Sequence, residues 1–308
     1  MAADAVLLIA FGGPTRPEEV RPFLANVVRG REHAVPRRRI EEVVRHYEAI
    51  GGRSPLNDLT LRQARKLEAL LAASGPALPV YVGMRNWEPY LADTLARMAA
   101  DGVRRAVAVI LSPHASEASR ERYMERVEAA RATLGARAPE VRYVGAWHVH
   151  PLFVTAVADA VTAALVTLPG PRRAAAPLVF TAHSVPVAMA ERSPYVNEII
   201  ASARAVVAAL GGAHWQVAYQ SRSGSPREPW LEPDVNDALR ALAAGGAADA
   251  VVVPIGFVVD HVEVLYDLDV EARATARSLG LGFARAGTVN DHPVFVRMLA
   301  DVVRRAAG

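Results

Sequence analysis

Residues 256–271 hold the densest group of side chains that bind hard cations or accept protons. The stretch reads GFVVDHVEVLYDLDVE and includes Glu263, Asp267 and Glu271. If a helix begins near residue 262, these three carboxylates lie at i, i+4 and i+8 on one face, and Asp269 points away from it. Like charges at this spacing disfavour a helix by about 0.2–0.5 kcal/mol per pair, which a cation bound along the row would offset. A solvated acidic face near a helix N-terminus explains the spacing equally well.

A histidine at the end of an apolar segment is the second candidate. His183 follows the apolar residues 178–182 and precedes a turn that contains Pro186. Alone, it is a proton acceptor, a metal ligand or a structural histidine. We expect a strand at 250–254 to lead toward Glu263, and because parallel strands end at the same edge of a sheet, His183 and Glu263 should meet in one crevice. A His and a Glu backed by carboxylates suit a divalent cation that is bound only briefly.

Two other short motifs favour structural roles. The Gly12-Gly13-Pro14 turn lacks both the Lys-Ser/Thr pair of a P-loop and the three glycines of a dinucleotide site, so we interpret it as a strand-exit turn. Ser184 has no Gly-x-Ser-x-Gly elbow around it, and neighbours on an extended chain point to opposite sides. We therefore do not expect Ser184 to act as a nucleophile with His183.

The elements that position these residues alternate along the chain. Short apolar segments rich in β-branched residues are separated by longer segments of Ala, Arg, Glu and Leu, which is typical of parallel strands joined by crossover helices. We predict strands at 5–10, 80–84, 106–111, 141–145, 178–181, 216–220 and 250–254. We predict helices at 17–28, 37–50, 58–73, 90–101, 116–135, 151–167, 195–210, 235–243, 262–279 and 292–307. The fold class is therefore α/β with parallel sheets.

A weak internal repeat divides the chain. Residues 6–14, VLLIAFGGP, resemble residues 178–186, LVFTAHSVP, and both segments have Pro three residues after their key residue, Phe11 or His183. We predict an N-terminal α/β domain at 1–150 and a similar C-terminal domain at 151–285. The last residues, 286–308, should form a helix that packs back on the body.

Composition excludes several classes of protein. The chain has 308 residues, 52% of them hydrophobic, which is enough for a full core. It has no cysteine, so thiolate catalysis and cysteine-held metal centres are excluded. A net charge of +3 with interspersed signs does not predict a nucleic-acid partner. The N-terminus has no basic leader and no apolar run is long enough to span a bilayer, so we expect a cytoplasmic protein.

Several long motifs, in order, resemble those of the ferrochelatase family. They cover almost the whole chain, which makes the resemblance far more specific than a single short pattern. The motifs are LIAFGGP (8–14), RHYEAIGGRSPLN (45–57), VGMRNW (82–87), TAHSVP (181–186), YQSRSG (219–224), PWLEPD (229–234) and PIGFVVDHVEVLYD (254–267).

The resemblance implies two Rossmann-like, chelatase-type domains around a porphyrin cleft and insertion of Fe2+ into a porphyrin. By this resemblance, His183 and Glu263 form the inner metal-binding and proton-handling pair, which is the catalytic pair. Asp267 and Glu271 match the outer acidic positions.

Four further residues are implied to contact the porphyrin: Phe11, Tyr47, Ser54 and Tyr123. The sequence also departs from its relatives. Phe11 stands where some relatives that use coproporphyrin have a tyrosine able to ligate iron, so that ligation is not available.

Arginines that face propionates in those relatives are replaced by Val28 and His46, and Arg29 and Arg53 are nearby substitutes. Arg120 stands where some actinobacterial relatives have a cysteine that holds an iron–sulfur cluster, so we expect no iron–sulfur cluster and no other permanently bound cofactor.

The motifs are most similar to those of actinobacterial members that act on coproporphyrin III, in haem biosynthesis. The expected product is Fe-coproporphyrin III, and the expected partners are porphyrin and iron alone, with the protein as a monomer. Protoporphyrin IX is the alternative substrate. A non-catalytic haem or porphyrin carrier and a cobalt or nickel chelatase for a sirohydrochlorin-type substrate are further alternatives.

Overall fold

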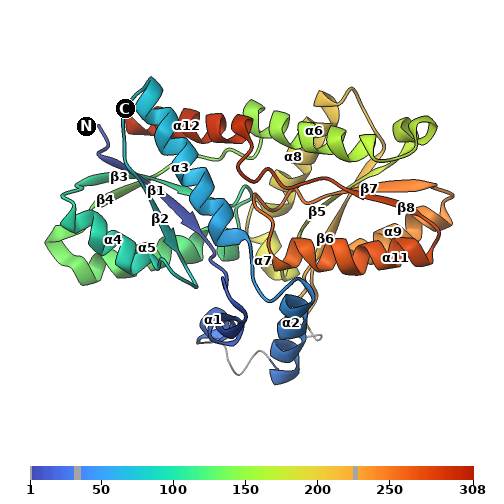
Figure 1. The fold of residues 1–308 in the computed structure, drawn as a ribbon, viewed down its shortest axis with the longest axis horizontal. Helices are drawn as coiled ribbons and strands as arrows, with labels where there is room; N and C mark the ends of the chain where they lie inside the picture. The colour runs from blue at the N-terminus through green and yellow to red at the C-terminus, as the bar shows by residue number, and fades with distance from the viewer. Residues whose placement is uncertain (1, 31–35, 225–227) are drawn as a thin grey trace.

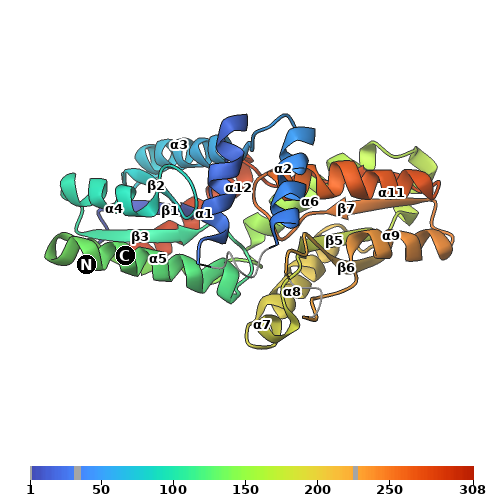
Figure 2. The ribbon, with the colours of Figure 1, turned by 90° about the horizontal axis from the view of Figure 1, so that it is seen from below.

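The strands of this protein form two parallel sheets that lie side by side. The computed structural model describes residues 2–30, 36–224 and 228–308, and within them each sheet has four strands (Figures 1 and 2). The first has the order β2-β1-β3-β4 and the second the order β6-β5-β7-β8, so the two halves share one topology. The strands are β1 (Ala5–Ala10), β2 (Val80–Met84), β3 (Arg105–Ile110), β4 (Glu140–Tyr143), β5 (Leu178–His183), β6 (Trp215–Gln220), β7 (Asp249–Val253) and β8 (Gly282–Arg285).

β1 and β5 are inner strands of their sheets, which explains why their sequences are continuously apolar. β1 is buried along its whole length, and its Leu8 lies opposite Val82 of β2 and Val109 of β3. β5 holds the same place between β6 and β7, with Phe180 fully buried. A parallel strand covered on both faces has no solvent side, so alternation of polar and apolar residues is lost. The predicted α/β class with parallel sheets is confirmed.

Helices cover both faces of each sheet, and some of them also pack across the junction between the two sheets (Figure 1). Residues from α3, α6, α8 and α12 share one apolar cluster with both sheets, whereas α4 and α5 pack on the other face of the first sheet. The longer helices are α1 (Val20–Val28), α2 (Arg37–Ala49), α3 (Leu56–Ser74), α4 (Leu91–Ala100), α5 (Arg122–Leu134), α6 (Pro151–Val166), α8 (Tyr195–Ala209), α9 (Val235–Ala244) and α12 (Pro293–Ala307). The last of these, α12, contacts α3 and α6, as expected for a C-terminal helix that folds back; the domain boundaries at 150 and 285 stay a prediction.

Helices α1 and α2 lie together over the junction of the two sheets, apart from the other helices (Figures 1 and 2). A small apolar cluster joins them, with Phe23 and Leu24 from α1 and Val44 and Tyr47 from α2. Val262 of the second half also belongs to this cluster. The two helices therefore bridge the halves at the edge where the strands end.

One predicted helix is wrong in its internal structure. The segment predicted as a helix at 262–279 consists of α10 (Val262–Leu265), a π-helix, η6 (Asp267–Ala272), and α11 (Arg273–Ser278). The amide N–H groups of Val270 and Glu271 both donate to the carbonyl of Tyr266, at 3.0 Å each. A wider turn of this kind often occurs at functional sites, and it changes which residues share a face.

Other elements were absent from the prediction. The strand β8 and the short helix α7 (Val187–Glu191) were not predicted, and the predicted solvent loop at 169–177 contains a 3-10 helix, Gly170–Ala175. The predicted helix at 116–135 begins with a π-helix, η3 (Glu117–Glu121), before α5. None of the helices in the described ranges is long and apolar enough to cross a membrane.

Candidate functional site

His183 and Glu263 meet between β5 and the segment that follows β7. His183 is the last residue of β5, and its Nε2 lies 3.6 Å from Oε1 of Glu263 in α10. The second carboxylate oxygen, Oε2, lies 3.4 Å from Nε2 of His261. Two imidazoles thus flank one carboxylate, and both side chains of the inner pair, His183 and Glu263, keep about a third of their surface exposed (29% and 34%).

The charges of the inner pair stabilise each other. Burial alone would raise the pKa of Glu263, but His183 and His261 outweigh it and hold that pKa well below its usual range. Burial would lower the pKa of His183, whereas the charge of Glu263 and the carbonyl of Ser184 raise it above its ordinary value. Glu263 is therefore ionised at neutral pH and His183 is a stronger base than a free histidine.

Close backbone packing brings the segments that carry His183 and Glu263 together. The amide of Gly256 donates to the carbonyl of Thr181 in β5, at 3.0 Å. A Cβ at Gly256 would lie 2.7 Å from Cα of Ala182, so only glycine allows the loop to pass this close to β5. The hydroxyl of Tyr195 donates to the carbonyl of His183 at 2.9 Å and fixes the end of the strand.

Asp267 lies behind Glu263 in a polar, buried setting. The Ser221 hydroxyl donates to Oδ2 of Asp267, and the side-chain amide of Gln220 donates to the carbonyl of Glu263 at 2.6 Å. Asp267 is buried, and this burial together with the charges of Glu263 and Glu271 raises its pKa to about 7. Asp267 can therefore gain or lose a proton near neutral pH.

The acidic row differs from the row expected on an ideal α-helix. Asp267 is buried and Glu271 is exposed, and both lie in the π-helix, whose wider turn gives them a different spacing from that of an α-helix. Asp269 does turn away, as predicted, and pairs with Arg285. No group of three or more His, Asp or Glu side chains in the described chain is arranged to hold a metal ion.

The four residues expected to contact a porphyrin lie at the same edge. Arg85 places its guanidinium 5.0 Å from the ring of Phe11 and 4.9 Å from the ring of Tyr123. Burial and then the charge of Glu263 raise the pKa of Tyr47, and burial is also the main cause of the raised pKa of Tyr123. Tyr47, Tyr123 and Ser54 are buried in this structure.

Positions that differ from the resembled family have other partners here. The ring of His46 stacks on that of Tyr266, with centroids 3.7 Å apart and planes 12° apart. This stack joins α2 to the residue before Asp267. Val28 is buried, and Arg29 and Arg53 are exposed.

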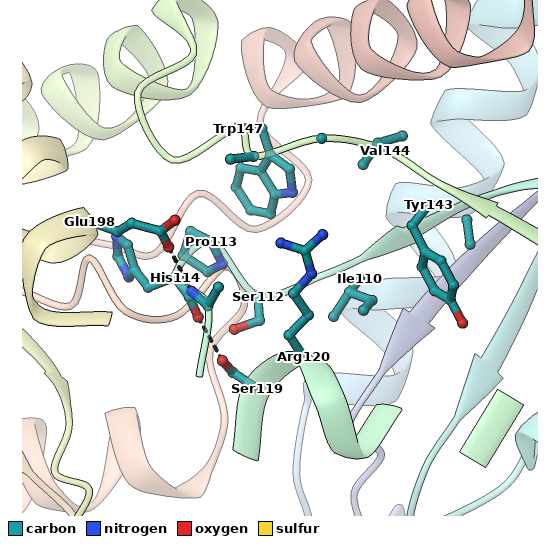
Figure 3. A pocket seen from close by; sticks show the side chains of 14 residues that line it. Ile110, Ser112, Pro113, His114, Ser119, Arg120, Tyr143, Val144, Trp147 and Glu198 are labelled. Carbon is teal, nitrogen blue, oxygen red and sulfur yellow. Dashed lines mark hydrogen bonds between the residues drawn. The ribbon is translucent and has the colours of Figure 1, made fainter. Parts of the chain in front are cut away.

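A small pocket lies elsewhere, beyond the ends of β3 and β4. Arg120 points into it below Trp147, while Glu198 accepts a hydrogen bond from the amide of Ala115 at 2.7 Å (Figure 3). Its lining contains none of the residues expected to bind metal or porphyrin: Ala108, Ile110, Ser112, Pro113, His114, Ala115, Ser119, Arg120, Tyr143, Val144, Gly145, Ala146, Trp147 and Glu198. This pocket is therefore separate from the inner pair.

Sequence reasoning did not assign three neighbours of the site: His261, Gln220 and Ser221. His261 stands two residues before Glu263, and that spacing was a usable signal. Ser221 has a φ of 63°, a left-handed conformation that is uncommon outside glycine. No sequence signal points to that backbone conformation.

Comparisons with known proteins identify the family. The family described as Ferrochelatase matches residues 3–307. Three curated relatives are named coproporphyrin III ferrochelatase: one from Mycolicibacterium smegmatis (45% identical, covering 98% of this chain and 89% of the relative), one from Nocardia farcinica (47%, 99% and 88%) and one from Mycobacterium avium (48%, 98% and 88%).

Solved structures show the same fold at low identity. The sirohydrochlorin chelatase SirB from Bacillus subtilis subspecies spizizenii, in complex with cobalt, has a TM-score of 0.57 at 13% identity and covers 98% of this chain and 94% of that one. SirB from Bacillus subtilis with Fe3+ has a TM-score of 0.62 at 11% identity, with coverage of 99% and 95%. These likenesses support a chelatase-type fold.

Proposed function

Because the chain belongs to the ferrochelatase family, we propose that it inserts Fe2+ into coproporphyrin III and releases Fe-coproporphyrin III, in haem biosynthesis. The observation that carries the proposal is the inner pair, in which His183 and Glu263 approach to 3.6 Å at the edge where the strands end. Relatives that are 45–48% identical over nearly the whole chain are named for this substrate.

The chemistry requires an acceptor for protons and a charge for the metal. Fe2+ replaces the two N–H protons of the macrocycle, so each turnover takes in one Fe2+ and releases two protons. In our proposal His183 accepts protons, because the charge of Glu263 and the carbonyl of Ser184 raise its pKa and make it a stronger base than a free histidine. Glu263 stays ionised and stabilises the incoming cation.

The outer carboxylates serve the same exchange. Asp267 has a pKa of about 7, which suits a group that passes protons onward from His183 or takes up a cation from solvent. Glu271 is exposed, so we place it at the solvent end of this route. Hard oxygen ligands that are not gathered into a closed site suit a metal that must leave again.

We propose that Phe11, Tyr47, Ser54 and Tyr123 contact the macrocycle. Phe11 offers only an apolar face, so it supplies no axial ligand to iron. Tyr47 lies on α2 and is buried in the cluster that joins α1 to α2, so we propose that these helices shift when a porphyrin enters.

The remaining proposals concern cofactors and partners. Iron–sulfur clusters are held mainly by cysteine thiolates, and the sequence contains none, so we propose no cluster. Arg120, at the position of a cluster cysteine in some relatives, points into the pocket of Figure 3. We also propose that the protein is a cytoplasmic monomer with no nucleic-acid partner.

The test is anaerobic absorption spectroscopy of the purified protein with Fe2+ and either coproporphyrin III or protoporphyrin IX. Faster conversion of coproporphyrin III supports the proposal. Faster conversion of protoporphyrin IX refutes the substrate assignment. Tight binding of both porphyrins without conversion refutes the activity and favours a carrier.

A further inference from the structure

Arg285 links the two ends of the segment that carries the inner pair's glutamate. It is the last residue of β8, and its side chain is only 13% exposed. Nε and Nη2 donate to the two carboxylate oxygens of Asp269, at 3.1 and 2.6 Å, and Nη1 donates to Asp260 at 3.1 Å. Asp260 precedes Glu263 by three residues and Asp269 follows it by six. One guanidinium thus binds a residue on each side of Glu263.

The same network reaches the first half of the chain through Asn290. Its side chain accepts from the amide of Asp260 and donates to Oδ2 of Asp260, both at 3.0 Å. The carbonyl of Asn290 in turn accepts from the side-chain amide of Gln63 in α3, at 2.7 Å. The loop before α10 is therefore fixed both to β8 and to a helix that packs on the first sheet.

The π-helix contains one of the residues that Arg285 binds. Asp269 lies inside it, two residues after Asp267. A bidentate arginine–carboxylate pair fixes direction as well as distance. When Asp269 is held by Arg285, the turn that carries Asp267 has a fixed rotation relative to Glu263.

We infer that Arg285 is a positioning residue for metal delivery: through Asp260 and Asp269 it sets the placement of Glu263 relative to Asp267. The inference rests on the proposed function and adds to it a residue that contacts neither metal nor porphyrin. Residues that orient ligands in this indirect way change metal affinity by about 10- to 100-fold when mutated.

Arg273 provides the matched control. It also donates to Asp269, at 3.2 Å, but its side chain is 52% exposed, and within the described chain its hydrogen bonds go to Asp269 and not to Asp260. The experiment compares R285Q, R285K and R273Q, with kcat and KM for Fe2+ measured at saturating coproporphyrin III, porphyrin affinity by fluorescence titration, and thermal unfolding for each.

We expect R285Q to raise KM for Fe2+ about 10-fold, with porphyrin affinity close to that of the unaltered chain. R285K should recover part of this loss, and R273Q should keep the original KM. If R285Q has a lower Tm but the same KM for Fe2+ as R273Q, the role of Arg285 is merely structural and the inference is overturned. If R285Q does not fold, D269N is measured instead, and an unchanged KM in that variant likewise overturns it.

Titration with Co2+ alone, followed by its visible absorption, separates this inference from the proposed function. Weaker Co2+ binding by R285Q than by R273Q supports the inference even if the unaltered chain metallates no porphyrin. Equal Co2+ binding by the two variants overturns it even if coproporphyrin III is the substrate.

Discussion

Substituting Gly256 with alanine should disturb the inner pair without changing any of its side chains. The new Cβ would lie 2.7 Å from Cα of Ala182, where ordinary contact begins at 3.4 Å. The loop must therefore move away from β5 by about 0.7 Å, and with it the segment that leads to Glu263. Backbone atoms on both sides of the contact leave no flexible side chain to absorb the strain.

The expected effect follows from that displacement. Misplacement of reacting groups by about 1 Å can reduce rates about 100-fold, so we expect G256A to lower kcat/KM by about 10- to 100-fold, or about 1.4–2.7 kcal/mol. Overpacking should also reduce the free energy of unfolding by about 1–3 kcal/mol.

The assay is iron insertion into coproporphyrin III under anaerobic conditions, with thermal unfolding in parallel. Gly287 is the control, because nothing lies within 4 Å of a Cβ built there, and G287A should behave like the unaltered protein. If G256A keeps both its activity within twofold of the unaltered protein and its Tm, close packing at this glycine does not position Glu263.

Three further outcomes are expected. H183A and E263Q should each reduce insertion at least about 100-fold, and near-normal rates in either variant would refute the inner pair. The pKa of Asp267 is raised to about 7 in the folded protein, so its contribution to stability is present in acid and is lost as pH rises from about 4 to about 7. D267N should remove this pH-dependent loss. The check is the free energy of unfolding of both proteins at pH 5 and pH 8. H46A should remove the stack on Tyr266 and lower the free energy of unfolding by about 0.5–1.5 kcal/mol. An unchanged free energy of unfolding would show that this stack does not help to hold α2 against the residue that follows α10.

The sequence predicted the elements whose apolar pattern is continuous. β1 matched its predicted bounds, 5–10, because a strand buried on both faces leaves an uninterrupted apolar segment bounded by a glycine turn. β8, with the sequence GFAR, was missed because it is short, lies at the edge of its sheet and has no β-branched residue.

The approach of His183 and Glu263 was predicted, but the detailed geometry around the pair was not. The meeting of His183 and Glu263 follows from strand order, which the repeat of the two halves indicates. The π-helix depends on whether the Val270 and Glu271 amides share one carbonyl, and side-chain spacing does not report that choice. The contact of His46 with Tyr266 joins two elements far apart in sequence, so it depends on tertiary packing alone.

The apolar cluster that runs through both sheets limits how a large ligand can enter the site between them. Val109 of the first sheet, Val253 of the second and Phe295 of α12 belong to one continuous core, and two bodies that share so much apolar surface do not swing apart about a hinge. α1 and α2 belong instead to a small separate cluster, whose loss exposes far less apolar surface. We therefore expect a large ligand to enter and leave by local movement of α1 and α2, so changes in those helices should alter its binding and release rates while the stability of the whole chain stays nearly constant.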